Sequence, residues 1–203
     1  MTYLEQSLEK LKEFEGCVPW MYRDTAGKVT VGVGLRASPA IPAEQSPRHP
    51  RRDRSRIRSR RRYDHGKAAA FYKIPTSLEL TQQTIDARLL AVLQGFEADL
   101  RAEFPTYDTF PDAIKLALLD MIYNLGATGL FHGFPHLVAA VKSGNWAQAA
   151  DHCSRRGPAP TRNIWTKQQF LSVIGAIEAE AETLLTRIWS RIRHIFSKSS
   201  GPQ

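Results

Sequence analysis

Two carboxylic acids and a hydroxyl group lie close together near the start of the chain. Glu15, Asp24 and Thr30 fall within the stretch EFEGCVPWMYRDTAGKVTVGVGL, with eight residues between the acids and five between Asp24 and Thr30. Hydrolysis of a glycosidic bond with inversion uses one protonated carboxyl group and one carboxylate, roughly 6.5–9.5 Å apart, and the carboxylate activates water. These residue types match that chemistry, although a surface turn can carry two acids with the same spacing.

The first acid is predicted to end a helix. Residues 3–15 place apolar side chains at spacings of four, three and three, which makes one stripe, and Gly16 follows as a C-cap. The stripe consists of Leu4, Leu8, Leu11 and Phe14. The carbonyl end of a helix repels negative charge, so this position, with partial burial, predicts a raised pKa for Glu15. Asp24, in a polar turn, is predicted to be ionised.

The second acid and the threonine are predicted to lie on a hairpin. The segments PWMYRD and KVTVGVGL are separated by Thr25-Ala26-Gly27, and Val29, Val31 and Val33 alternate with small or polar residues. This period of two predicts strands joined by a turn. Asp24 then lies near the bend, and Thr30 lies in the returning strand, where its hydroxyl group is able to orient a water molecule.

The C-terminal half is predicted to be a helical bundle. Residues 81–103 form one candidate helix with Thr81 as N-cap, and residues 111–124 form another that Gly126 closes. Shorter helices follow around FPHLVAAVKSG, NWAQAADHC and TRNIWTKQQFLSVIGAI. The last segment, TLLTRIWSRIRHIFSK, is a basic amphipathic helix, for which we favour packing onto the bundle over contact with a membrane surface.

The positive charge of the chain is concentrated in one segment. The net charge is +8, and residues 48–62 contain nine arginines and one acid, so the rest of the chain sums to zero. Residues 37–66 have no apolar period, which predicts a disordered insertion or a stretch read in a shifted frame. Arg48–Arg62 would bind nucleic acid through phosphates only, because no motif that reads a groove is present.

The composition of the chain argues against a membrane span, a secretory signal and a cysteine-based metal site. No run of about 18 apolar residues is present, so no membrane span is predicted. The N-terminus lacks the pattern of a secretory signal, which predicts synthesis in the cytoplasm, so any work outside the cell would need another exit route. Cys17 and Cys153 have no metal-ligand spacing, so we expect no metal and no cofactor. Two free thiols are favoured, although a disulfide between them stays open.

The stretch from Glu15 to Gly34 resembles the active-site hairpin of the phage-type lysozymes, including the T-even phage enzyme. The shared residues are Glu15-Gly16, Tyr22, Asp24, Gly27, Thr30, Gly32 and Gly34. LLDMIYNLGATGLFHGF, GNWAQAADHC and PTRNIWTKQQF resemble the later helices of that family in the same order, so the resemblance covers roughly half of the chain.

The resemblance implies an α+β, mostly helical, two-lobed lysozyme-like fold with a cleft between a small β-hairpin lobe and a helical-bundle lobe. Residues 1–80 would form the first lobe with the basic insertion, residues 81–180 the helical lobe beginning with the inter-lobe helix, and residues 181–203 an amphipathic extension. By resemblance, Glu15 is the proton donor, Asp24 the water-activating carboxylate and Thr30 the group that holds the water. The binding residues it implies are Tyr22, Gly34, Tyr123, Asn124 and Arg162, the last as the partner of Glu15.

The resemblance implies an endolysin-type muramidase that cuts the β-1,4 bond between N-acetylmuramic acid and N-acetylglucosamine in peptidoglycan. We expect a monomer, with anionic cell-wall polymers or a membrane surface as further partners of Arg48–Arg62 and the C-terminal helix. The alternatives are a catalytically weak cell-wall-binding relative and, less favoured, a nucleic-acid-binding protein. The arginine-rich stretch occupies the place where the family usually continues the small lobe with a third strand.

Overall fold

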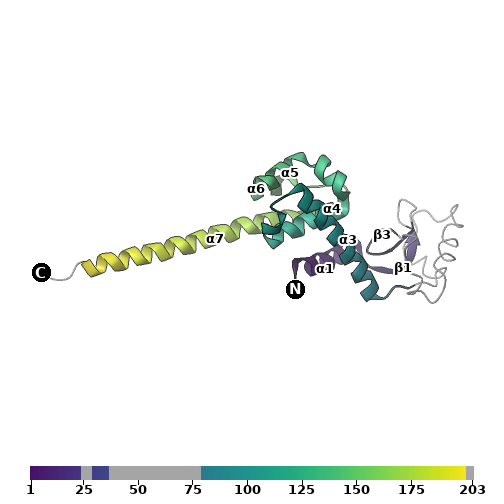
Figure 1. Cartoon of the computed structure of the whole chain (residues 1–203), viewed down its shortest axis with the longest axis horizontal. Coiled ribbons are helices and arrows are strands. Elements are labelled where there is room, and N and C mark those ends of the chain that lie inside the picture. Colours follow the sequence, from purple (N-terminus) through teal and green to yellow (C-terminus); the bar gives the residue numbers. More distant parts are fainter. Residues whose placement is uncertain (24–28, 37–78, 200–203) are drawn as a thin grey trace. The chain divides into compact units, whose positions relative to one another are not determined.

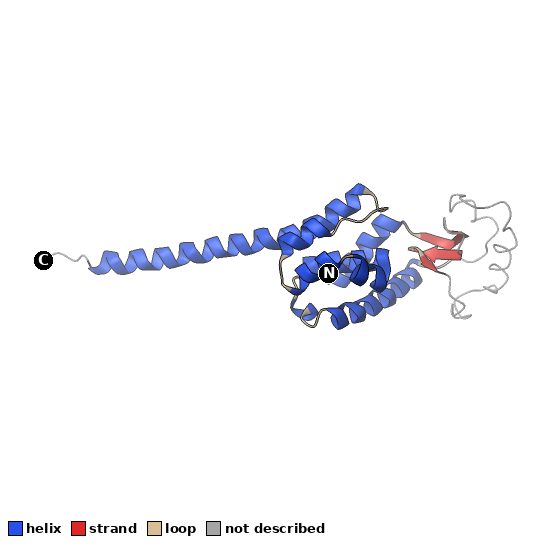
Figure 2. Cartoon of the chain, turned by 90° about the horizontal axis from the view of Figure 1, so that it is seen from above, coloured by secondary structure: helices blue, strands red, loops and turns tan. Residues whose placement is uncertain are grey.

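The computed structural model describes residues 1–23, 29–36 and 79–199 (Figure 1). The chain divides into two compact units, Met1–Asp99 and Leu100–Gln203. The predicted insertion at 37–66, with Arg48–Arg62, lies outside the described residues, as does Asp24. Within the described residues the protein is mostly helical with one small antiparallel sheet, which confirms the predicted fold class (Figure 2).

The first unit combines a helix with a three-stranded antiparallel sheet. Helix α1 spans Tyr3–Glu15, and strands β1, β2 and β3 span Val18–Arg23, Val29–Gly32 and Leu35–Arg36 in the order β1-β2-β3. The predicted helix and hairpin are thus confirmed. The short third strand was not foreseen, because two residues are too few to show an alternating pattern.

Helix α1 begins with a capping box and is tied to helix α3, which spans Gln82–Glu103. The hydroxyl group of Thr2 accepts from the backbone N–H of Glu5, and the Glu5 carboxylate accepts from the backbone N–H of Thr2. Lys12 of α1 forms ion pairs with Glu9, at 2.6 Å, and with Asp86 of α3, at 3.1 Å. Burial lowers the pKa of Lys12, but the hydrogen bonds to these two carboxylates outweigh it, and the net pKa is raised.

Apolar side chains of α1, of α3 and of β2 with the turn after it form the core of the first unit. Each fully buried Leu or Ile contributes about 1.5–3 kcal/mol relative to exposure. The buried residues include Leu8, Leu11, Val31, Val33, Leu80, Ile85, Leu89 and Leu93. Thr81 accepts a hydrogen bond from the backbone N–H of Thr84 at 3.2 Å, which confirms the predicted N-cap of α3.

The second unit is a bundle of helices, as predicted. After the 3-10 turn Tyr107–Thr109, helices α4, α5, α6 and α7 span Asp112–Gly133, Pro135–Lys142, Trp146–His152 and Pro160–Ser199. Helix α7 packs against α4 and α6, and α5 packs against α6. The core is lined by Leu100, Phe104, Tyr107, Ile114, Leu118, Ile122, Leu130, Val141, Ala149 and Phe170.

Helix α4 contains one break, at the predicted position. Gly126 has φ 72° and ψ 166°, a conformation outside the helical region that an L side chain rarely adopts, and the helix resumes beyond it to Gly133. Among the described helices, α4 alone is long and apolar enough to cross a membrane by length and composition. More than half of its most apolar stretch is buried within the protein, which is typical of the core helix of a bundle.

Helix α7 is one continuous helix of 40 residues. Its first part is anchored by Phe170 and Val173, which are buried, but every residue from Gly175 to Ser190 is exposed. The prediction that the C-terminal segment packs onto the bundle is therefore wrong for its residues 183–190, and the side chains of residues 191–198 lie outside those described. The bundle covers only the first part of α7, and the apolar stripe continues past that covered part.

Candidate active site

Glu15 is the last residue of α1 and is exposed. Leu8 and Leu11 of the same helix are buried, so the apolar stripe holds the helix in the first unit while its end faces outward. Gly16 follows as the C-cap with φ 73°, and it turns the chain toward β1. The predicted position of Glu15 at a helix C-terminus is confirmed, whereas the partial burial expected for it is not found, because the residue is exposed.

The turn between β2 and β3 lies beside the Glu15 carboxylate. A Cβ atom at Gly34 would lie 3.9 Å from Oε2 of Glu15. Gly34 has φ +67°, where a side chain is strained, and as a glycine it places no side chain against the carboxylate. Val33 in the same turn is fully buried, which anchors the turn in the core of the unit. Two of the predicted site residues, 15 and 34, are therefore neighbours.

Thr30 lies in the middle of the sheet and is 2% exposed. Its Cα is paired with that of Tyr22 on β1 and with that of Arg36 on β3. The side chain of Tyr22 and the whole of Asp24 lie outside the described residues, and Asp24 follows Arg23, the last residue of β1, in the chain. The register thus places Tyr22 and Thr30 opposite each other on the two strands that flank Asp24 in the sequence.

The second unit, taken by itself, contains a buried ionic network that centres on Asp120. Oδ2 of Asp120 accepts from Nη2 of Arg155 at 2.7 Å and from Oγ1 of Thr166 at 2.8 Å, and Oδ1 accepts from Nε of Arg162 at 2.8 Å. All four residues are at most 5% exposed. Two guanidinium groups share one carboxylate here, so Asp120 fixes the position of Arg162 in the bundle.

Asp120, Arg155 and Thr166 were missed by reasoning from the sequence. They come from α4, from the segment before α7 and from α7, and such a network has no signal in local spacing. The one signal available was the presence of Asp120 within the apolar run of α4, where an unpaired carboxylate would be costly. The predicted pairing of Arg162 with Glu15 concerns residues of different units and stays a prediction.

Tyr123 and Asn124 lie on α4 just before its break at Gly126. Tyr123 is half-buried and Asn124 is exposed, so the amide side chain of Asn124 is accessible from solvent. Their predicted role in binding stays a prediction, as does that of Tyr22. Within the described residues, no group of three or more His, Cys, Asp or Glu side chains is arranged to hold a metal ion.

The sequence profile of the family described as phage lysozyme matches residues 12–159, which is more than half of the chain. The chain belongs to the phage lysozyme family. The matched range contains every predicted site residue except Arg162, and it ends before α7 begins. The predicted resemblance is thereby confirmed at the level of the family.

A solved structure shows that the fold is lysozyme-like. A crystal structure of a P22 lysozyme mutant is similar with a TM-score of 0.54 and 19% sequence identity, covering 84% of this chain and 99% of that chain. At this identity the likeness concerns the fold alone. None of the curated protein sequences compared with this chain matches it.

Proposed function

We propose that this phage lysozyme family member is an endolysin-type muramidase. It hydrolyses the β-1,4 bond between N-acetylmuramic acid and N-acetylglucosamine in peptidoglycan, and it acts on the cell wall after release from the cell that makes it. The observation that carries the proposal is the position of the Glu15 carboxylate at the end of α1, beside the β2–β3 turn, where Gly34 places no side chain against it.

Glu15 donates a proton to the leaving glycosidic oxygen in this proposal. Glu15 is exposed at the end of its helix, and the neighbouring Gly34 adds no side chain against its carboxylate. General acid catalysis of this kind contributes about 10²–10⁴-fold to the rate. The family membership of the matched segment supports this role for Glu15.

Asp24 and Thr30 act on the water molecule. Asp24 serves as the general base, and the hydroxyl group of Thr30 orients the water for attack on the opposite side of the sugar ring, which inverts the anomeric centre. The burial of Thr30 within the sheet supports this role, because a hydroxyl group held by three strands keeps a fixed position. The residues predicted to bind the substrate are Tyr22 and Gly34 of the first unit and Tyr123 and Asn124 of the second, and Arg162 remains the predicted partner of Glu15.

Product analysis of the full chain on purified peptidoglycan tests the proposal. We expect turbidity to fall, new reducing ends to appear on N-acetylmuramic acid, and the α-anomer to form first, because inversion of a β-linkage gives that anomer. Absence of new reducing ends under conditions where the protein binds the cell wall would identify a wall-binding relative and contradict the proposal. If the β-anomer forms first, the protein is still a muramidase, but its mechanism is not an inverting one.

A further inference from the structure

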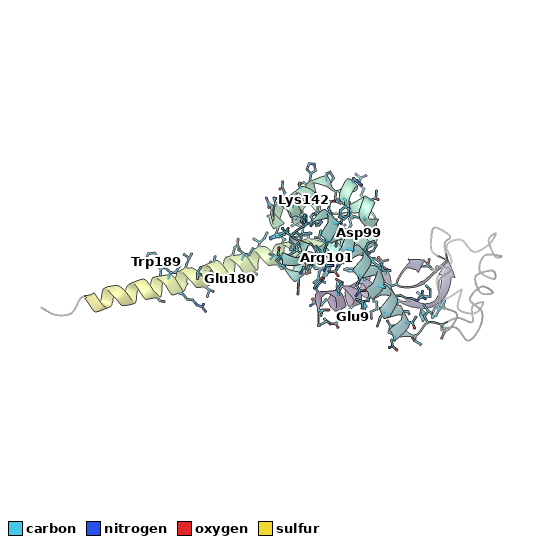
Figure 3. The ribbon with its side chains drawn as sticks, in the orientation of Figure 1. Glu9, Asp99, Arg101, Lys142, Glu180 and Trp189 are labelled. Carbon is cyan, nitrogen blue, oxygen red and sulfur yellow. The ribbon has the colours of Figure 1, made fainter. Side chains whose placement is uncertain are left out.

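The C-terminal part of α7 presents a continuous apolar face that no described residue covers. Five large apolar side chains on it are 44–61% exposed. They are Ile177, Leu184, Leu185, Ile188 and Trp189. Figure 3 shows Trp189 and Glu180 on the part of α7 that extends away from helices α4, α5 and α6 of the same unit. A long helix gains most of its stability from packing of its apolar face, so we expect this face to be buried against another surface.

The face has helical periodicity over its whole length. Ile177, Leu184 and Ile188 are separated by seven and four residues and share one side of the helix, and Leu185 and Trp189 widen that side. The sequence continues the pattern at Ile192 and Ile195, and the backbone is helical through Ser199. The repeat is typical of a helix that pairs with another helix over several turns.

Charge is distributed unevenly along the same segment. Glu178, Glu180 and Glu182 form an acidic stretch, whereas Arg187, Arg191, Arg193 and Lys198 lie C-terminal to it. Two parallel copies would place like charges side by side. Two antiparallel copies would place the acidic stretch of each beside the basic stretch of the other.

The apolar and charged patterns agree on one antiparallel register. When Leu184 of one copy faces Ile188 of the other, position 177 faces position 195, and both are isoleucine. The same register sets residues 178–182 alongside residues 190–194, which include Arg191 and Arg193. A twofold interface of this kind uses the same surface on both copies.

We propose that the occupant of this face is a second copy of the chain, which pairs through residues 177–199 of α7 in antiparallel orientation. This replaces the expectation of a monomer. A membrane surface fits less well, because helices that bind membranes carry a polar face rich in Lys and Arg. Residues 177–199 instead mix three glutamates with four Lys or Arg residues, so the segment is not predominantly basic.

Sedimentation equilibrium of the full chain tests the proposal directly. We expect a mass near 45.8 kDa, twice the chain mass of 22.9 kDa. Replacing Ile188 with Asp, at an exposed position, should shift the mass to that of one chain without loss of helix in the bundle. The matched control Ile164→Gln, at a residue of α7 that is 56% exposed outside this face, should keep the mass of the wild type.

Charge reversal tests the orientation. The variant with Glu178, Glu180 and Glu182 changed to Arg should be monomeric, and so should the variant with Arg191 and Arg193 changed to Glu. Mixing the two in equal amounts should restore the dimer mass, because each acidic stretch then meets a basic one. A parallel pair would tolerate the first variant alone, so a dimer that survives it would overturn the antiparallel arrangement.

A monomeric wild type would overturn the proposal. If that monomer co-sedimented with vesicles of phosphatidylglycerol and phosphatidylcholine, and Ile188→Asp abolished the co-sedimentation, the occupant of the face would be a membrane surface. Failure of the mixed charge-reversal variants to associate would also count against the proposed register.

Discussion

Replacement of Asp120 by Asn tests the buried ionic network of the bundle. Asp120 is 3% exposed and accepts hydrogen bonds from Arg155, Arg162 and Thr166 at 2.7–2.8 Å. Asparagine has nearly the same shape, but it removes the only carboxylate in this network of four residues. Its NH₂ group cannot accept a hydrogen bond, so one of the guanidinium donors would face another donor.

The size of the effect follows from burial. Removing one member of a buried ion pair costs about 3–5 kcal/mol, because the remaining charge is left buried without compensation. Two arginine hydrogen bonds at about 1.5–3 kcal/mol each give a similar sum. We therefore expect Asp120→Asn to lower the free energy of unfolding by at least about 3 kcal/mol. For a chain of this size the melting temperature should fall by roughly 6–12 °C.

Urea unfolding followed by circular dichroism at 222 nm provides the assay. The matched control is Asp151→Asn, which removes one carboxylate from α6, where Asp151 is 71% exposed and pairs with Lys167 at 3.0 Å. An exposed pair contributes about 0–1 kcal/mol, so the control should stay close to the wild type. A loss of less than about 1 kcal/mol for Asp120→Asn would refute the argument that burial makes this carboxylate essential to the bundle.

Three further results are expected. Thr30→Val should lower the rate of reducing-end release by about 10²-fold with little change in wall binding, because it removes the hydroxyl that orients water, whereas Thr30→Ser should retain most activity. Gly34→Ala should reduce activity and lower the free energy of unfolding by about 1–2 kcal/mol, since it places a side chain at a residue with positive φ beside Glu15. The control Gly175→Ala, at an open position within a helix, should leave the stability unchanged or raise it. Burial raises the pKa of Cys153, although Arg155 opposes this, so a thiol reagent at pH 8 should modify exposed Cys17 in the native protein and Cys153 only after unfolding. The pKa of Cys153 is higher in the folded state than in the unfolded state, so its contribution to stability should be complete below the unfolded pKa of about 8.5 and decline above it. Unfolding curves recorded across pH would measure this decline. Equal reactivity of both thiols in the native state would contradict the burial argument.

Local signals predicted the elements that position Glu15 and Thr30. The stripe of α1, the glycine after Glu15 and the alternation of valines in β2 each rest on contacts within a few residues, and all three features are present in the structure. The cap at Thr81 and the break at Gly126 are of the same kind. Such features depend on residues a few positions apart, so they are visible in the sequence.

Features that depend on distant partners were not predicted. The Asp120 network joins residues up to 46 positions apart, and no spacing rule connects them. The exposure of the C-terminal part of α7 was predicted wrongly, because an apolar stripe looks the same whether it packs on its own bundle or faces outward. Periodicity identifies the face of a helix, whereas only the length of the neighbouring helices decides how much of that face is covered.

The central claim is that Glu15 donates the proton that breaks the glycosidic bond. The most direct test compares Glu15→Gln with Glu13→Gln on purified peptidoglycan, since Glu13 lies two positions earlier on the same helix and its side chain is 65% exposed beside Lys10. The rate of reducing-end release should fall by at least about 10²-fold for Glu15→Gln and stay at the wild-type level for Glu13→Gln, with both variants folded. Wild-type rates for Glu15→Gln, or equal losses in both variants, would contradict the claim.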